Sequence, residues 1–146
     1  MEKELFTGYS HIGIYVTDLD ESIKFYQEVL DFDFLFRLLN ESDGLKIAML
    51  RLNNCTIELL EPPSDREYLV SKEQVVNGAL ATINHVGILV SDMQKAVDRV
   101  KSFGYEFEHR GVYHVPNFGR DTLDLNVAFF RGPNGERIEL FLEIEK

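Results

Sequence analysis

The sequence has little cysteine, few basic residues and no long apolar run. Its single cysteine, Cys55, excludes an internal disulfide and is typical of the reducing cytoplasm. No run of about 18 apolar residues is present, so no membrane-spanning helix is predicted. The first residues lack the apolar segment of a secretory signal peptide. Lys and Arg number 15 against 25 Asp and Glu, and the net charge of −10 disfavours nucleic acid and anionic lipid as partners. We therefore expect a cytoplasmic protein that binds neither nucleic acid nor membranes.

What the sequence does contain is an internal repeat. Segments 11–16 and 85–90 both read His-aliphatic-Gly-Ile-x-Val, and segments 56–61 and 137–143 both place a Glu between aliphatic residues. Because such repeats indicate a duplicated supersecondary unit, we predict two copies of one module. A chain of 146 residues is long enough to bury a core as one domain. The predicted domain 1–146 divides into module one (9–62), a connector (63–82) and module two (83–146).

Each module is predicted to run in the order strand, helix, strand, strand, strand. Alternating apolar residues and turn signals predict strands at 10–17, 32–39, 45–52 and 55–61, and again at 83–90, 105–109, 124–131 and 137–143. Amphipathic helices are predicted after the first strand of each module, to about Leu30 and about Phe103. Their N-caps are expected at Asp18 or Asp20 and at Ser91 or Asp92. The stretch 110–124 is predicted to be a long polar loop of the kind that lines sites.

Four polar residues occupy matched positions in the two modules. Side chains alternate along a strand, so His11 and His85 lie opposite the aliphatic residues of their strands, as do Glu58 and Glu139. If the helices cover the aliphatic faces, all four project from the uncovered face, which a glycine two residues after each His keeps open. A single His or Glu in a strand is usually a surface residue, but a solvated face does not need the same residue twice. Two imidazoles and two carboxylates are a usual ligand set for a divalent metal. The sequence therefore predicts a metal site formed by His11, Glu58, His85 and Glu139.

Other polar residues lack this support from the repeat. The roles of His109, His114 and Arg120 are left open, because none has a counterpart in module one. Cys55 lies three positions before Glu58 on one strand, so it is expected on the opposite face and without a catalytic role.

The duplicated module, opened by His11 or His85 and closed by Glu58 or Glu139, resembles the vicinal oxygen chelate superfamily. That superfamily includes glyoxalase I, methylmalonyl-CoA epimerase, extradiol dioxygenases and fosfomycin or bleomycin resistance proteins. The resemblance covers about residues 9–143. It implies an α+β fold in which two tandem βαβββ modules form a curved, barrel-like mixed sheet with helices on the outer face. It also implies a homodimer with one divalent metal ion per site (Ni, Co, Zn or Mn), within one chain or across the dimer.

Two subfamilies are similar in different segments. The ligand order His, Glu, His, Glu and the segment 132–140 (GPNGERIEL) resemble glyoxalase I, the lactoylglutathione lyase. The segment 57–62 (IELLEP) is similar to methylmalonyl-CoA epimerase. Tyr15 and Pro62 occupy the positions with which glyoxalase I contacts glutathione, so the thiol carrier is left open.

The resemblance to glyoxalase I implies a metal-dependent lyase or isomerase that acts by enolisation of a chelated 2-oxo or hemithioacetal substrate. Glu139 would be the base that moves the proton, with Glu58 as its partner. The substrate would be a thiol adduct of a 2-oxoaldehyde. One alternative is racemisation of an acyl-CoA, as in the epimerase. A second is a non-catalytic protein that binds a small molecule or an antibiotic.

Overall fold

The computed structural model describes residues 9–67, 71–77, 83–118 and 120–146. The chain divides into two compact units, residues 1–67 and 68–146, and each contains one four-stranded sheet. The division falls inside the predicted connector. Residues 1–8, Gly119 of the predicted loop, and connector residues 68–70 and 78–82 lie outside the described residues.

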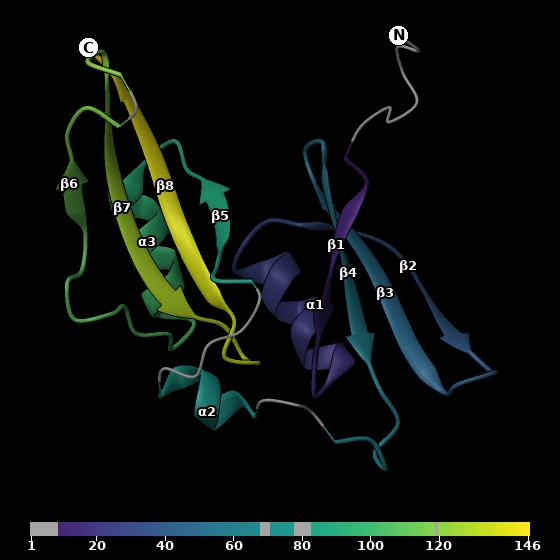
Figure 1. Cartoon of the computed structure of the whole chain (residues 1–146). Coiled ribbons are helices and arrows are strands. Elements are labelled where there is room, and N and C mark those ends of the chain that lie inside the picture. The colour runs from purple at the N-terminus through teal and green to yellow at the C-terminus, as the bar shows by residue number, and fades with distance from the viewer. Residues whose placement is uncertain (1–8, 68–70, 78–82, 119) are drawn as a thin grey trace, which may run out of the picture. The chain divides into compact units, whose positions relative to one another are not determined.

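The first unit runs in the predicted order of strand, helix and three strands (Figure 1). Its elements are β1 (His11–Tyr15), α1 (Leu19–Glu28), β2 (Asp33–Asn40), β3 (Leu45–Leu52) and β4 (Cys55–Glu61). The strands lie in the order β1-β4-β3-β2, with β1 parallel to β4 and the other pairs antiparallel. Parallel strands need a long crossover, which α1 and the β2–β3 hairpin provide between β1 and β4.

The second unit repeats this topology. Its elements are α2 (Lys72–Val76), β5 (Val86–Leu89), α3 (Met93–Ser102), β6 (Tyr113–Val115), β7 (Leu123–Arg131) and β8 (Arg137–Glu145). The strands lie in the order β5-β8-β7-β6, again with one parallel pair, β5 and β8. The short helix α2 belongs to the connector.

The structure corrects one part of this prediction. The expected strand at 105–109 contains only a single bridge, between Phe107 and Phe130, and the second strand of this unit is instead β6, inside the stretch predicted as a loop. The reason is side-chain packing, because the rings of Tyr105 and Phe107 both contact the ring of the fully buried Phe130. The chain then turns at Gly111, whose φ of +60° favours glycine, and enters β6 beside β7.

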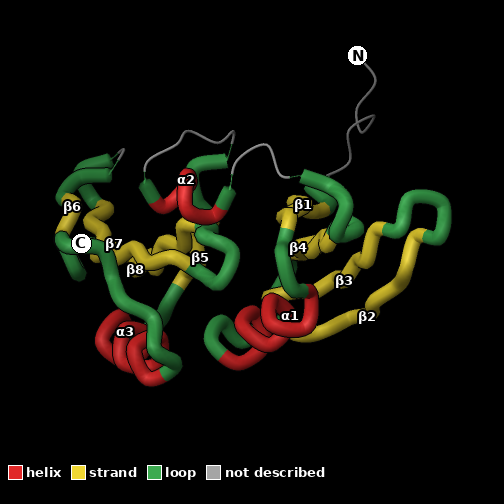
Figure 2. The backbone as a smooth tube through the Cα atoms, turned by 90° about the horizontal axis from the view of Figure 1, so that it is seen from below, coloured by secondary structure: helices red, strands yellow, loops and turns green. Residues whose placement is uncertain are grey.

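Each of the two longer helices covers one face of its own sheet (Figure 2). They begin where a carboxylate can accept backbone hydrogen bonds: Asp18 accepts from the N–H of Glu21, and Asp92 from the N–H of Lys95. The buried residues of the helices and of the covered sheet faces include Leu19, Ile23, Phe25, Tyr26, Leu50, Ile57 and Leu59 in the first unit and Met93, Val97, Val100, Ala128, Phe130, Ile138 and Leu140 in the second. The predicted α+β fold of two βαβββ modules is confirmed, as two open four-stranded sheets with one in each unit. Within the described part of the chain, no helix is long and apolar enough to cross a membrane.

Candidate metal centre

The second unit brings His85 to Glu139. In the parallel ladder Gly87 is the partner of Glu139, so His85, just before β5, lies diagonally beside that carboxylate. His85 Nε2 is 2.7 Å from Glu139 Oε2. Glu139 is only 7% exposed and is the one charged residue that is buried among those described. Burying a carboxylate destabilises a fold unless a cation or hydrogen-bond donors lie beside it. The contact with the His85 imidazole therefore offsets part of the cost of burying Glu139.

The first unit brings His11 to Glu58 in the same way, but less closely. Gly13 is the partner of Glu58 in the β1–β4 ladder, and His11 Nε2 is 3.8 Å from Glu58 Oε2. The Glu58 side chain is 25% exposed. A Cβ added at Gly13 would lie 3.9 Å from Glu58 Oε1 and 3.2 Å from Leu60 Cδ1, so glycine does keep this face open. The two pairs therefore share one design and differ in how tightly they are held.

The second ring nitrogen of each His is contacted by the residue before it. Asn84 Oδ1 lies 2.6 Å from His85 Nδ1, and Ser10 Oγ lies 2.9 Å from His11 Nδ1. An amide oxygen only accepts hydrogen bonds, so His85 Nδ1 carries the proton in this contact. The neutral imidazole then presents the Nε2 lone pair to the Glu139 carboxylate. Two lone pairs at 2.7 Å repel each other unless a cation lies with them, either a proton or a metal ion.

This donor set fits a divalent metal. Each unit provides one imidazole nitrogen and one carboxylate oxygen, a mixture that Ni, Co, Zn and Mn accept. No group of three or more His, Cys, Asp or Glu side chains that could hold a metal ion occurs in the described ranges. Each unit therefore supplies a pair of candidate ligands.

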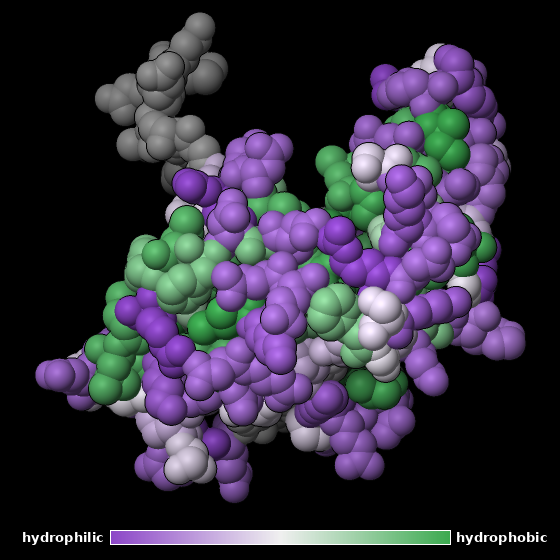
Figure 3. All heavy atoms as spheres, turned by 180° about the vertical axis from the view of Figure 1, so that it is seen from behind, coloured by the Kyte–Doolittle hydropathy of each residue, from purple (hydrophilic) through white to green (hydrophobic). Residues whose placement is uncertain are grey.

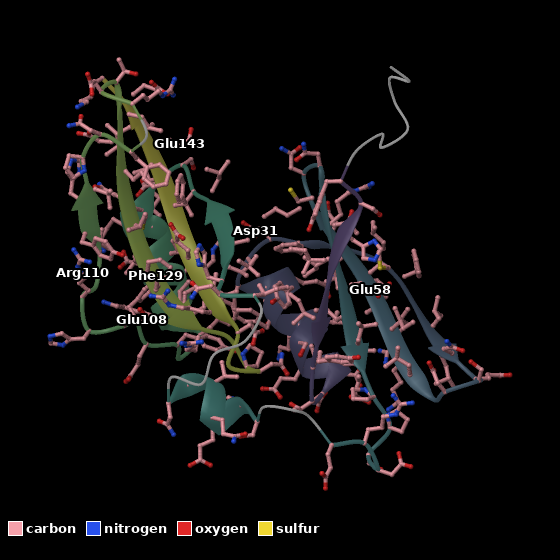
Figure 4. All side chains as sticks on the ribbon, viewed as in Figure 1. Asp31, Glu58, Glu108, Arg110, Phe129 and Glu143 are labelled. Atoms are coloured by element: carbon pink, nitrogen blue, oxygen red, sulfur yellow. The ribbon has the colours of Figure 1, made fainter. Side chains whose placement is uncertain are left out.

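The surroundings of Glu139 are aromatic and apolar. Phe129 is its partner across the β7–β8 ladder, and Val127, Phe141 and Tyr113 line the same face farther along the sheet. Figure 4 labels Phe129 on this sheet, and Glu58 on β4 of the other unit. In the first unit the registers place Met49, Phe36, Leu60 and Tyr15 on the face of Glu58. Both carboxylates thus project from apolar sheet faces that the helices do not cover.

An arginine adjoins the face of Glu139. The guanidinium of Arg137 lies 3.8 Å over the Phe129 ring and donates to Glu108, with Nε–Oε1 and Nη2–Oε2 distances of 2.7 and 2.8 Å. The hydrogen bond from Arg137 lowers the pKa of Glu108 and raises the pKa of Arg137, while burial opposes both shifts. The pair therefore stays ionised and fixes the arginine beside the aromatic ring.

The remaining polar candidates form separate contacts. His114 lies on β6 on the face opposite Tyr113, with Nε2 3.0 Å from Asp124 Oδ2. The backbone N–H of Asn117 donates to Asp124 and is the main reason why the pKa of that carboxyl is lowered. Arg120 forms an ion pair with Glu145. His109 and Cys55 are exposed.

Sequence reasoning missed Asn84, Arg137 and Glu108. One signal was available, because a polar residue precedes each repeated His: Ser10 in module one and Asn84 in module two. The pairing of Arg137 with Glu108 had no such signal, since the residues are 29 positions apart and the contact depends on the segment before β6.

A family model described as the Glyoxalase/Bleomycin resistance protein/Dioxygenase superfamily matches residues 8–140. The chain belongs to this superfamily. The predicted resemblance is therefore confirmed. The chain is also similar to the uncharacterized protein YwbC of Bacillus subtilis (strain 168), with 26% identity over 134 residues that cover 90% of this chain and 94% of YwbC.

Solved structures of superfamily proteins share the fold. The fosfomycin resistance protein FosX from Listeria monocytogenes, solved with Mn(II) and sulfate, has a TM-score of 0.64 at 17% identity, covering 94% of this chain and 93% of FosX. A glyoxalase I mutant from Zea mays has a TM-score of 0.66 at 22% identity, covering 88% of this chain and 42% of the maize chain.

Proposed function

We propose that this superfamily member is a divalent-metal-dependent lyase or isomerase of the glyoxalase I type. His11, Glu58, His85 and Glu139 are its proposed metal ligands, and the metal is Ni, Co, Zn or Mn. The observation that carries the proposal is that each unit brings a His Nε2 to a Glu Oε2, while the preceding residue engages Nδ1. The presence of Mn(II) in the structurally similar FosX supports a metal in this fold.

Glu139 is the proposed base. A bound divalent ion would supply Lewis acidity toward two neighbouring substrate oxygens. The Glu139 carboxylate takes the proton from the carbon beside the carbonyl, and the C–H electron pair moves toward the carbonyl oxygen. For a hemithioacetal, the carboxylate then returns this proton to the former carbonyl carbon, and the hydroxyl proton of the first carbon passes to the former carbonyl oxygen. The product is a 2-hydroxy thioester, so the reaction is an isomerisation without net redox change.

Glu58 is the proposed partner of this base. Its side chain is more exposed than that of Glu139 and is held less closely by its His. The apolar side chains around it, including Met49, Leu60 and the 63%-exposed Tyr15, offer contacts to the non-reacting part of a thiol adduct. An acyl-CoA is the alternative substrate, since its racemisation uses the same proton transfer.

The proposal includes a homodimer. The edge strand β2 exposes apolar side chains, and hydrophobic surface is visible on this unit in Figure 3. The exposed residues are Phe34, Leu35, Phe36, Leu38 and Leu39. An edge strand of this kind needs cover, which a second copy can provide. Light scattering at micromolar concentration is expected to give the dimer mass, and a monomer mass would contradict this part of the proposal.

Metal analysis tests the proposed function. Protein purified without chelator is expected to contain about one divalent ion per site, and His11→Ala and His85→Ala should each lose most of it. His109→Ala is the matched control, because His109 is exposed and outside both pairs. Full metal retention by the His11→Ala/His85→Ala double variant would overturn the proposal.

Turnover assays then distinguish the substrate classes. The metal-loaded protein is assayed with methylglyoxal hemithioacetals of several thiols and with methylmalonyl-CoA. Turnover of a hemithioacetal supports the glyoxalase type, whereas turnover of methylmalonyl-CoA alone replaces it with the epimerase type. Tight binding of a ligand without turnover and without dependence on metal would favour a binding protein.

A mixed dimer shows whether one chain or two supply each metal site. Chains carrying His11→Ala are combined with chains carrying His85→Ala. If every site takes its ligands from one chain, each site in the mixed dimer lacks a His and no metal is bound. If each site combines module one of one chain with module two of the other, one of the two sites keeps all four ligands and binds metal.

A further inference from the structure

A chain of contacts runs from Glu108 through Arg137 and Asn84 to His85. Glu108 receives two hydrogen bonds from Arg137, through Nε and Nη2. The remaining terminal nitrogen, Nη1, donates to Asn84 Oδ1 at 3.4 Å. The same oxygen lies 2.6 Å from His85 Nδ1. A carbonyl oxygen has two lone pairs, so Asn84 Oδ1 accepts both hydrogen bonds at once.

One aromatic ring, that of Phe129, contacts both Arg137 and His85 in this chain of contacts. The Arg137 guanidinium lies over Phe129 at 3.8 Å, and the His85 ring meets Phe129 edge-on at a centroid distance of 5.6 Å. Figure 4 labels Phe129 on β7 and Glu108 in the segment that precedes β6. Phe129 is buried and the Arg137 side chain is 26% exposed, so neither group moves freely in solvent. The ring and the ion pair therefore give the Asn84 amide a fixed donor.

The contact with Arg137 also sets which way the Asn84 amide faces. Arginine has no acceptor, so the group directed toward it must be the amide oxygen rather than the NH2. That oxygen then requires a proton on His85 Nδ1, which leaves Nε2 available as a ligand. A metal-binding imidazole is typically oriented in this way, by an acceptor for its second nitrogen.

We propose that Arg137 is a positioning residue for the metal centre. Anchored by Glu108, it acts through Asn84 to fix the ring orientation and the Nδ1–H tautomer of His85. The inference rests on the proposed function, because it requires that His85 binds metal. Lysine cannot replace Arg137, since only the guanidinium fork serves Glu108 with two nitrogens and directs a third toward Asn84.

Module one has different residues at the positions of Asn84 and Arg137. Ser10 occupies the position of Asn84, and its hydroxyl can donate or accept, so it does not set the tautomer of His11. By the offset between Glu58 and Glu139, Thr56 takes the place of Arg137. The two histidines are therefore distinguishable in an experiment, with His11 as the internal control.

The first test measures the Kd for zinc by competition with a chromophoric chelator. Asn84→Ala and Arg137→Lys are each expected to raise this Kd about 10- to 100-fold. The zinc Kd of the double variant should not exceed that of the weaker-binding single variant, because both changes interrupt the same chain of contacts to His85. Asn84→Asp should restore affinity, since a carboxylate also accepts from Nδ1–H. Arg131→Lys is the matched control: Arg131 is the ladder partner of Arg137 but donates to the carbonyl of Gly135.

The second test observes the Nδ1–H proton of the metal-bound His85. In the cobalt(II)-loaded protein, the exchangeable imidazole protons of His85 and His11 give separate shifted NMR signals. Asn84→Ala should speed solvent exchange of the His85 signal at least severalfold and leave the His11 signal unchanged. A merely structural role of Asn84 would not single out one proton. Asn84 is exposed, so this variant is expected to fold, which the melting temperature of the metal-free protein checks.

The possible results separate this inference from the proposed function. If the wild type binds no metal, the proposed function fails. If the wild type binds zinc and Asn84→Ala binds it equally well, the positioning role is refuted while the metal site stands. Additive losses in the double variant would show that Arg137 acts independently of Asn84, and they would overturn the inference.

Discussion

Replacing Gly87 by alanine tests whether the face of Glu139 is the working face of the second sheet. Gly87 is the direct partner of Glu139 in the β5–β8 ladder. A Cβ built at this position meets no atom within 4 Å, and the Gly87 backbone is not in the left-handed region that only glycine tolerates. The added methyl group therefore enters open space without strain. Because alanine loses less backbone entropy than glycine on folding, the free energy of unfolding should rise by about 0.5–1 kcal/mol.

The same methyl group should impair turnover. It projects from the strand on the side of His85 and Glu139, where the proposed substrate must approach the carboxylate. One methyl-sized change in a pocket is worth about 1–3 kcal/mol, which corresponds to a 10- to 200-fold fall in kcat/KM. The variant is thus expected to be more stable and less active. Urea unfolding and steady-state kinetics measure the two effects on one preparation.

Gly13→Ala is the comparison in the first unit. Its methyl group would lie 3.2 Å from Leu60 Cδ1, so Leu60 must shift by a few tenths of an ångström. Leu60 is only partly buried and its side chain can yield, so the gain in stability should be smaller than for Gly87→Ala. A stabilised Gly87→Ala protein with unchanged kcat/KM would show that substrate does not use this face. A destabilised one would refute the account of the open strand position.

Three further predictions concern the second unit. Glu139→Gln should keep the fold and lose about 10²–10⁴-fold in activity, with slower deuterium exchange at the substrate carbon and no oxygen consumption; near-normal exchange would assign the base to Glu58. Because Arg137 lowers the pKa of Glu108 in the folded state, the pair stabilises the fold above the ordinary pKa of 4.5, and this stability is lost as the pH falls through the lowered value. Glu108→Gln should therefore unfold more easily at neutral pH, and its unfolding free energy should fall less steeply below pH 4.5. Asp92→Ala should cost about 1 kcal/mol through loss of the α3 cap, as measured by urea unfolding.

Elements fixed by local signals were predicted well from the sequence. The bounds expected for β3 and β4 agree with the structure, because both strands alternate cleanly and are separated by turn residues. Both helices begin after an expected cap, and Gly104 after α3 has the positive φ that ends a helix. Each of these features depends on residues a few positions apart.

The prediction that failed, a strand at 105–109 in place of β6, concerns a feature that depends on residues far apart in the sequence. β6 has only three residues, and its strand conformation comes from pairing with β7. Segment 105–109 was predicted as a strand instead of β6. Its Tyr105 and Phe107 rings pack against Phe130, so its apolar side chains are in contact with the core although its backbone forms no continuous strand pairing. An apolar pattern shows that a segment is buried, but it does not show whether backbone or side chains make the contact.

The repeat predicted two equivalent pairs, and the structure makes them unequal. Alternation correctly placed each His and Glu on one face, and the ladders confirm these faces. Metal binding itself stays a prediction. What the repeat could not provide is the environment: Glu139 is buried at 2.7 Å from a His whose other nitrogen contacts Asn84, whereas Glu58 is 25% exposed at 3.8 Å from its His.

The difference in burial and in distance to the neighbouring His suggests different roles for Glu139 and Glu58 in the proposed reaction. An enzyme of the proposed kind needs one carboxylate held in a constant position against the reacting carbon, and it gains from another that can yield when substrate arrives. The buried Glu139, packed against Phe129 and held by His85, meets the first requirement. The more exposed Glu58 meets the second. At the corresponding positions, module one has Ser10 and Thr56, whereas module two has Asn84 and Arg137, which contact each other next to His85. These surroundings support the proposed assignment of Glu139 as the base, in addition to the resemblance.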